Sequence, residues 1–185
     1  MRIVAGRFRG QTLATPSSQA IRPTSDRLRE SLFNILEHGY GDPVPGARVL
    51  DLFAGTGALG FEAMSRGAAS CLFVEEAAEA RGLIRRNQEA LGLMGTTRIF
   101  RRDARRMGSI GPAEPYHLAF LDPPYGKGLG EEALASLAGG GWLAPGALVL
   151  LEESAKGEVA LPPAYALIER RDFGDTQLLF ARDVR

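Results

Sequence analysis

The stretch Asp-Pro-Pro-Tyr, formed by Asp122, Pro123, Pro124 and Tyr125, directly follows the apolar run HLAFL. Two successive prolines hold the backbone and remove two N–H donors, which leaves the Pro123 carbonyl as a rigid acceptor. Asp122 supplies a second acceptor. Two acceptors that hold the hydrogens of an exocyclic amino group favour a pyramidal nitrogen whose lone pair can attack a methyl group. A ring stacked on Tyr125 would gain roughly 1–3 kcal/mol. The motif predicts methyl transfer to a nucleobase amino group.

A second motif, DLFAGTGALG at residues 51–60, places Gly55, Gly57 and Gly60 at the G-x-G-x-x-G spacing of nucleotide-binding turns. An NAD-dependent oxidoreductase would use the same glycines. Asp51, however, is a poor neighbour for a pyrophosphate, which prefers bare N–H groups and a helix N-terminus. It suits the ammonium and sulfonium charges of S-adenosylmethionine. The turn therefore favours S-adenosylmethionine as cofactor and S-adenosylhomocysteine as product.

Two further carboxylates follow the next predicted strands. Glu75 closes CLFVE, where it can accept hydrogen bonds from both ribose hydroxyls of either cofactor. Asp103, in RRDA, is placed to accept from an adenine amino group, although an exposed turn aspartate is the alternative. The expected cofactor-binding residues are Asp51, Phe53, Gly55, Gly57, Glu75 and Asp103.

Alternating strand and helix patterns must position these motifs. Apolar runs predict strands at 47–53, 70–76, 96–103, 116–122, 146–153, 165–173 and 176–182, with helices at 57–66, 77–92 and 129–138. Continuous apolar strands between amphipathic helices indicate a parallel sheet that is covered on both faces. The last two strands, joined by a tight turn, predict an antiparallel edge hairpin. The fold class is a doubly wound, Rossmann-like α/β sheet.

An N-terminal extension precedes this alternation. The pieces RIVAG and QTLAT predict a small β-hairpin, and a helix follows with Thr24 or Ser25 as its N-cap. We therefore divide the chain into an N-terminal extension, residues 1–45, and a catalytic domain, residues 46–185.

Arginines are concentrated in two regions although the net charge is zero. Residues 1–30 hold six arginines and two carboxylates, and residues 81–106 hold eight arginines and two carboxylates. Guanidinium groups suit phosphate contact and base stacking, although a merely solvated arginine-rich face is the alternative. The arginines expected to contact a nucleic-acid backbone are Arg7, Arg9, Arg22, Arg27 and Arg29.

Composition excludes several classes of protein. With 45% hydrophobic and 24% charged residues, the chain is typical of globular proteins. Its apolar runs are shorter than the roughly 18 residues that span a bilayer. The single Cys71 is expected to be a buried core thiol, which fits a reducing cytoplasm. His38 and His117 are too far apart in the sequence to suggest a site, so no metal is expected. We also expect a monomer.

Several motifs together carry a family resemblance. DLFAGTGALGFEAMSRGA, DPPY, RIVAGRFRGQTL and RPTSDRLRESLFNIL resemble the bacterial 16S ribosomal RNA guanine-N2 methyltransferases. The resemblance covers nearly the whole chain. It implies a class I, S-adenosylmethionine-dependent enzyme that modifies one guanine of the small ribosomal subunit.

Three other functions stay open. DPPY alone is shared with DNA adenine-N6 methyltransferases, which would keep the chemistry and change the substrate. An NAD-binding oxidoreductase leaves Asp51 and DPPY unexplained. A non-catalytic RNA-binding module is the third. The target nucleotide, and whether naked RNA or an assembled subunit is the substrate, are also open.

Overall fold

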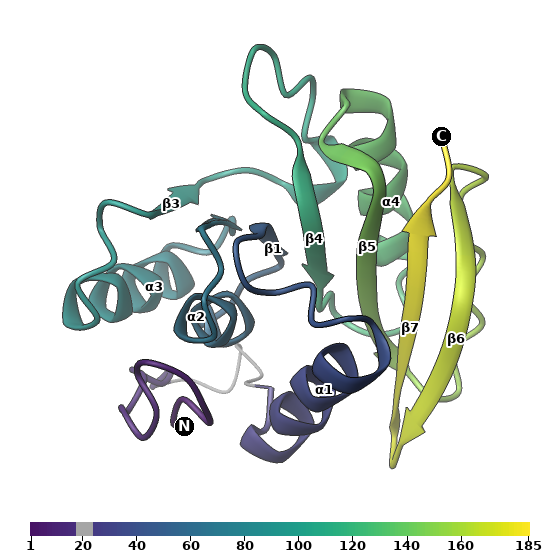
Figure 1. The fold of residues 1–185 in the computed structure, drawn as a ribbon. Helices are drawn as coiled ribbons and strands as arrows, with labels where there is room; N and C mark the ends of the chain where they lie inside the picture. The colour runs from purple at the N-terminus through teal and green to yellow at the C-terminus, as the bar shows by residue number, and fades with distance from the viewer. Residues whose placement is uncertain (18–23) are drawn as a thin grey trace.

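The alternating pattern produces one seven-stranded sheet (Figure 1), in a computed structural model that describes residues 1–17 and 24–185. The strand order is β3-β2-β1-β4-β5-β7-β6. The strands are Arg48–Leu52 (β1), Ser70–Val74 (β2), Thr97–Phe100 (β3), Tyr116–Leu121 (β4), Leu143–Ser154 (β5), Tyr165–Phe173 (β6) and Thr176–Asp183 (β7).

The sheet is mostly parallel, with an antiparallel C-terminal hairpin, as the sequence predicts. Strands β1 to β5 pair in parallel, and β7 pairs antiparallel with both β5 and β6. The antiparallel strand β7 is not itself the edge, because it lies between β5 and β6 and leaves β6 outermost. The chain thus forms a doubly wound, Rossmann-like sheet.

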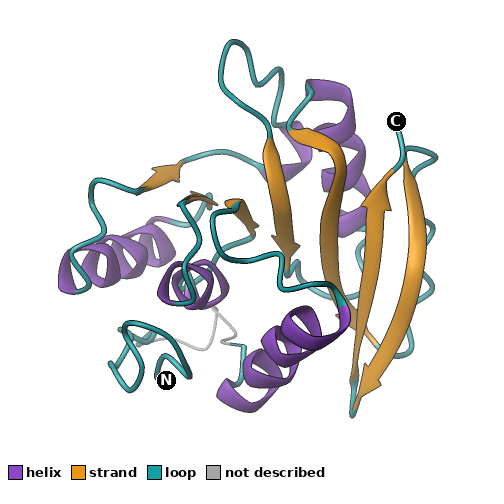
Figure 2. Cartoon of the chain, viewed as in Figure 1, coloured by secondary structure: helices purple, strands orange, loops and turns teal. Residues whose placement is uncertain are grey.

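Helices cover both faces of the sheet (Figure 2). Side chains of α1 (Asp26–Gly39), α2 (Ala58–Ser65) and α3 (Ala78–Ala90) pack against one face. The other face is covered by α4 (Leu129–Gly140) and by a 3-10 turn, η1 (Ala104–Arg106). The sequence did not predict η1, and β3 ends at Phe100, three residues before the expected end of that strand.

Helix α1 begins where one of the two expected N-cap residues caps it. The Ser25 side chain accepts a hydrogen bond from the Leu28 N–H at 3.1 Å, which satisfies a donor of the first turn. Leu32, Phe33 and Leu36 form the buried face of the helix. Ser25 is therefore the N-cap, so the helix does not need the Thr24 side chain as its cap.

The N-terminal hairpin is shorter than the sequence suggests. Its one ladder pair among the described residues is an antiparallel bridge between Arg2 and Thr12, supported by a 3.0 Å bond from the Ile3 N–H to the Gln11 carbonyl. Ile3 and Leu13 are each 1% exposed. Burial of these side chains, rather than a long ladder, holds the segment in place.

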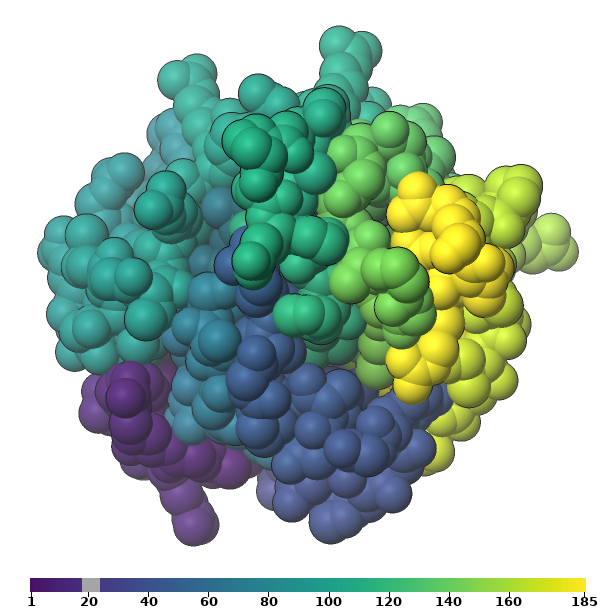
Figure 3. All heavy atoms as spheres, turned by 45° about the horizontal axis from the view of Figure 1, so that its top comes forward, coloured from purple at the N-terminus to yellow at the C-terminus, as the bar shows by residue number. Residues whose placement is uncertain are grey.

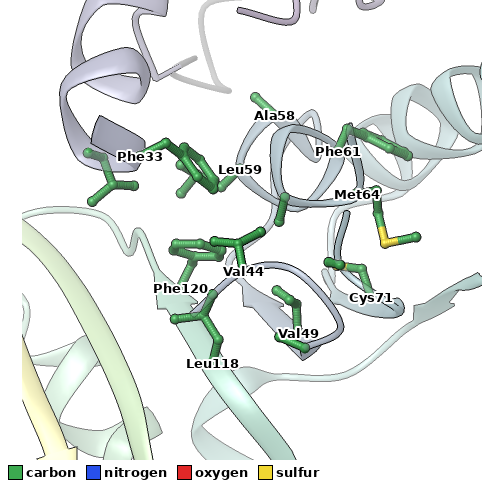
Figure 4. Close-up of a cluster of buried hydrophobic side chains, with 14 of the residues drawn as sticks. Phe33, Val44, Val49, Ala58, Leu59, Phe61, Met64, Cys71, Leu118 and Phe120 are labelled. Atoms are coloured by element: carbon green, nitrogen blue, oxygen red, sulfur yellow. The ribbon is translucent and has the colours of Figure 1, made fainter. Parts of the chain in front are cut away.

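One face of the sheet and the N-terminal extension share a hydrophobic core (Figure 4). Phe33 of α1 lies against Phe120 of β4, with ring centroids 5.5 Å apart. Alternate residues of the strands divide between the two faces, so Leu118 and Phe120 enter this core and Leu121 enters the opposite one. Residues 1–17 and 24–45 thus include side chains that pack on the sheet, and the separate RNA-binding role of the extension stays a prediction.

Cys71 and the two histidines have different environments. Cys71 is buried, and burial raises the pKa of its thiol. His38 and His117 are exposed, and His117 Nδ1 accepts the Arg48 N–H. Across residues 1–17 and 24–185 we find no helix that is long and apolar enough to cross a membrane. The same residues hold no cluster of three potential metal ligands.

Candidate functional site

A cavity of about 950 Å³ opens where the strand order reverses between β1 and β4. This reversal at the carboxyl ends of parallel strands is where ligands bind in open α/β sheets. Four segments supply the walls, because each follows one of the neighbouring strands β1 to β4. The segments contribute Phe53–Thr56, Glu75–Ala77, Asp103 and Asp122–Tyr125.

The glycine-rich turn after β1 requires backbone conformations that few side chains tolerate. Phe53, Gly55 and Gly57 have φ values of 56°, 59° and 81°, in the left-handed region that favours glycine. A Cβ on Gly57 would lie 2.7 Å from the Phe61 ring, and one on Gly60 would lie 2.4 Å from the Phe73 ring. The glycines thus permit both the turn and the close packing of α2 on β2.

Asp51 lies at the floor of the cavity and is 1% exposed. Its Oδ2 accepts a 3.0 Å hydrogen bond from the Gly60 N–H, so the carboxyl ties β1 to helix α2. Burial, reinforced by the charge of Glu75, raises the Asp51 pKa to about 8, although the bond from Gly60 opposes that shift. The group therefore changes charge near neutral pH.

We expect Asp51→Asn to change how stability depends on pH. The folded protein holds this proton more tightly than the unfolded chain, where the pKa is near 3.8. Its contribution is present below pH 4 and is lost as the pH rises through about 8. Stability of the variant, relative to the unmodified chain, should therefore rise between pH 5 and pH 8.5.

Thermal denaturation at several pH values across that range tests this expectation. Glu37→Gln, on the exposed surface of α1, is the matched control and should follow the unmodified chain. Parallel profiles for Asp51→Asn and the unmodified chain would contradict the buried, proton-binding role.

Glu75 and Asp103 line the same cavity. The two Glu75 oxygens accept the Gly55 N–H at 2.8 Å and the Ala77 N–H at 2.9 Å, so this side chain orders the glycine turn. Asp103 accepts two-pronged hydrogen bonds from Arg105, which hold the pKa of its carboxyl below the usual range. The structure thus brings all six expected cofactor-binding residues to one end of the sheet.

The Asp-Pro-Pro-Tyr segment forms another wall of the cavity. The Asp122 Oδ2 accepts a hydrogen bond from the Thr24 hydroxyl at 3.0 Å, which joins the N-terminal extension to this segment. Pro123 is buried and Pro124 is exposed. No donor from residues 1–17 or 24–185 reaches the Pro123 carbonyl.

Tyr125 is anchored through its hydroxyl. It donates to Glu152 Oε1 at 2.9 Å, and the hydroxyls of Tyr125 and Thr176 lie 2.8 Å apart. Glu152 belongs to β5 and Thr176 to β7, so the antiparallel strand helps to fix the ring at the cavity. These two contacts of the hydroxyl hold the Tyr125 ring in its orientation.

Several cavity residues were missed from the sequence. Thr24 was considered only as an N-cap, and Arg105, Lys127 and Leu129 were not singled out. Glu152 does not line the cavity but bonds to Tyr125, and it could have been found because it follows the apolar run LVLL just as Asp122 follows HLAFL. Thr24 carries no such signal, since its contact with Asp122 spans 98 positions.

The predicted RNA-binding arginines have different environments. Arg7, Arg9 and Arg27 are exposed, and Arg22 lies outside the described residues. For Arg29 the prediction was wrong. Its side chain is fully buried. Its N–H donors are satisfied by the carboxylates of Glu62 and Asp26 and by the carbonyls of Arg2 and Thr24.

Glu62 is the centre of the network that buries Arg29. This fully buried α2 residue accepts the Arg29 Nε at 3.3 Å and the Arg66 Nε at 2.9 Å. It also accepts the N–H groups of Val4 and Ala5. The network fastens the extension to the helix that begins at the glycine turn, so Arg29 has a structural role.

A glycine turn and an Asp-Pro-Pro-Tyr segment that face one switch-point cavity define the chain as a Rossmann-like methyltransferase. It belongs to the family described as Conserved hypothetical protein 95, whose model matches residues 1–182.

Individual relatives agree with this assignment. Ribosomal RNA small subunit methyltransferase D from Escherichia coli strain K12 is 39% identical over 166 residues, 89% of this chain and 80% of that protein. The solved structure of yhhF from Escherichia coli has a TM-score of 0.83 and 33% identity, covering 100% of this chain and 98% of that one. A tRNA (guanine(6)-N2)-methyltransferase from Thermus thermophilus is 35% identical over 173 residues, 81% of this chain but half of that protein.

Proposed function

We propose that this methyltransferase transfers a methyl group from S-adenosylmethionine to the N2 amino group of a guanine in small-subunit ribosomal RNA, in the cytoplasm. One observation carries the proposal. Asp122, Pro123 and Tyr125, which suit a nucleobase amino group, line the same cavity as the glycine turn, which suits a nucleoside cofactor. Donor and acceptor could therefore meet without a covalent enzyme intermediate.

The residues of the cavity fit S-adenosylmethionine better than NAD. The buried Asp51 carboxyl lies beneath the turn, where a cation would favour its charged form. Glu75 offers acceptors for ribose hydroxyls and Asp103 an acceptor for the adenine amino group. When bound, the cofactor supplies an electrophilic methyl group on a positively charged sulfur.

The chain's own groups would hold the target base. In this mechanism the Asp122 carboxylate and the Pro123 carbonyl accept hydrogen bonds from the two N–H groups of the guanine amino group, which keeps its lone pair aimed at the methyl group. The N–CH3 bond would form as the S–CH3 bond breaks, and Asp122 would take the proton that the methylated nitrogen loses. Tyr125 stacks on the flipped base. Positioning supplies most of the catalysis, because two reactants held in line lose little further entropy in reacting.

The relatives support the RNA substrate. The Escherichia coli relative is named for the small-subunit ribosomal RNA, and the Thermus thermophilus relative for the N2 atom of guanine. The extension, residues 1–45, would supply phosphate contacts through Arg7, Arg9 and Arg27, which are exposed. Such contacts give affinity that falls with salt and carries little sequence information.

We expect the ring of Tyr125 to matter more than its hydroxyl. Tyr125→Ala should lower kcat/KM for RNA roughly 5- to 150-fold, because stacking contributes about 1–3 kcal/mol. Tyr125→Phe keeps the ring and loses the bonds to Glu152 and Thr176, so it should cost roughly 2- to 10-fold. Steady-state kinetics with saturating cofactor measures both, and equal losses in the two variants would contradict a stacking role.

Two measurements test the proposed function. Calorimetric titration should detect binding of S-adenosylmethionine and no binding of NAD, and the reverse result would overturn the cofactor assignment. Labelled cofactor is then supplied with unmodified small subunits, naked 16S rRNA and DNA. Mass spectrometry should find N2-methylguanine in the RNA, whereas methyladenine in DNA alone would support the other amino-methyltransferase class.

A further inference from the structure

A group of exposed arginines lies along the β3 edge of the sheet, apart from the N-terminal extension. They come from α3, from β3 and the residue after it, and from η1. The group, called the β3-edge arginines below, consists of Arg85, Arg86, Arg98, Arg101 and Arg106, and all five are exposed.

Nearby carboxylates balance these side chains only in part, since in the described part of the chain Arg106 alone of the five acts on a carboxylate whose pKa is shifted, that of Asp103. Among the described residues, none of the five forms an ion pair with a carboxylate. Helix α3 carries two carboxylates, Glu79 and Glu89, and Glu79 accepts a hydrogen bond from Ser17. A cluster of like charges repels itself and costs stability, so an external anion would relieve it.

The opposite edge of the sheet behaves differently. On β6, Arg170 pairs with Asp172 and Arg171 pairs with Glu169, each at 3.0 Å. Arginines at both edges are thus exposed to solvent, but within the described residues only those on β6 have carboxylate partners at ion-pair distance. The abundance of arginine in the chain therefore does not by itself explain the β3 edge.

One hydrogen bond and one sequence neighbour connect the elements that bear the β3-edge arginines to the N-terminal segment and to the cavity. At one end, the N-terminal segment reaches α3 where the Ala14 N–H donates to Asn87 at 2.7 Å, and the Arg7 N–H donates to the Ser65 carbonyl of the neighbouring helix α2. Figure 3 shows the N-terminal atoms adjoining this side of the molecule. At the other end, Arg106 adjoins Arg105, which lines the cavity.

We infer that the β3-edge arginines form a second surface for the RNA phosphate backbone, extending from the N-terminal segment across α3 to the cavity rim. The inference rests on the proposed function, because it assumes an RNA substrate. Guanidinium groups suit phosphate oxygens in geometry as well as charge. The surface would add affinity and orientation without reading bases.

Salt-dependent binding of a labelled, unmodified 16S rRNA transcript tests the inference. Arg85→Gln with Arg86→Gln should reduce the slope of log affinity against log salt by roughly 1.5 and weaken binding roughly tenfold or more near 0.1 M salt. Arg85→Lys with Arg86→Lys keeps both charges and should keep the slope. Calorimetric affinity for S-adenosylmethionine should not change in either variant, which also shows that they are folded.

Two further variants separate the inference from the proposed function. Arg170→Gln with Arg171→Gln, on the balanced β6 edge, should leave the slope unchanged, and an equal loss there would reduce the effect to net charge and overturn the inference. Arg7→Gln with Arg9→Gln tests the N-terminal contacts. If that variant alone loses slope, the inference is wrong and the proposed function stands.

Three other outcomes also test the inference or the proposed function. If the Arg85 and Arg86 glutamine variant alone loses slope, the inference holds and the N-terminal contacts fail. If it binds the naked transcript normally but assembled subunits weakly, the surface contacts protein and the RNA inference is overturned. If the unmodified chain neither binds nor methylates the transcript or subunits, the proposed function fails first.

Discussion

Replacement of Asp122 by alanine is expected to lower the rate of methyl transfer by about 10²- to 10⁴-fold. The structure places Asp122 and Pro123 on the same cavity wall, and the Asp122 Oδ2 accepts a hydrogen bond from Thr24. Without Asp122 the guanine amino group would lose one of its two acceptors. Single-turnover transfer of a labelled methyl group measures the loss.

Conservative variants separate catalysis from folding. Asp122→Asn keeps the size of the side chain but offers an N–H donor where an acceptor is needed, so it should be nearly as inactive as Asp122→Ala. Thr24→Val removes only the hydroxyl bond to Asp122 and should lose less activity than either. RNA binding and cofactor affinity should survive in all three, and unchanged turnover of Asp122→Asn would refute the assigned role.

Replacement of Arg29 by leucine is expected to cost about 3–5 kcal/mol of unfolding free energy, because it leaves the buried Glu62 without one cationic partner. The carbonyls of Arg2 and Thr24 lose a donor as well. For a chain of this length each 1 kcal/mol lowers Tm by roughly 2–4 °C. Urea denaturation and thermal melting measure the effect.

A neighbour on the same helix is the matched control. Arg27 is exposed, so Arg27→Leu should change stability by no more than about 0.5 kcal/mol. The order of the two effects should be reversed in an RNA-binding assay. Arg27→Leu should weaken binding more than Arg29→Leu, because Arg27 is available to phosphate and Arg29 is not. A stable Arg29→Leu protein with reduced salt dependence of RNA binding would restore the original interpretation of Arg29.

Asp122 and Arg29 show which roles can be predicted from neighbouring residues in the sequence and which cannot. Asp122 could be identified because it follows an apolar strand and precedes two prolines, and strand ends in a parallel sheet meet at one edge. Arg29 could not be assigned correctly, because its partner Glu62 is 33 positions away on another helix. The sequence shows that an arginine is charged, but burial depends on what packs against it.

The sheet, too, was predicted from the sequence only in part. Apolar runs and turn residues predict the seven strands, while the insertion of β7 between β5 and β6 is decided by pairing across the sheet. The long β5 shows this as well. Leu143 joins that strand by pairing with Tyr116, three residues before the strand that the sequence predicts.

The sequence alone determined the fold class, the glycine turn, the Asp-Pro-Pro-Tyr segment and the carboxylates that end successive strands, because each depends on neighbouring residues or on strand periodicity. Only the tertiary structure decided that Thr24 holds Asp122, that Glu152 and Thr176 hold Tyr125, and that Arg29 lies inside. Those contacts join residues far apart in the chain. Their geometry exists only after packing brings the elements together.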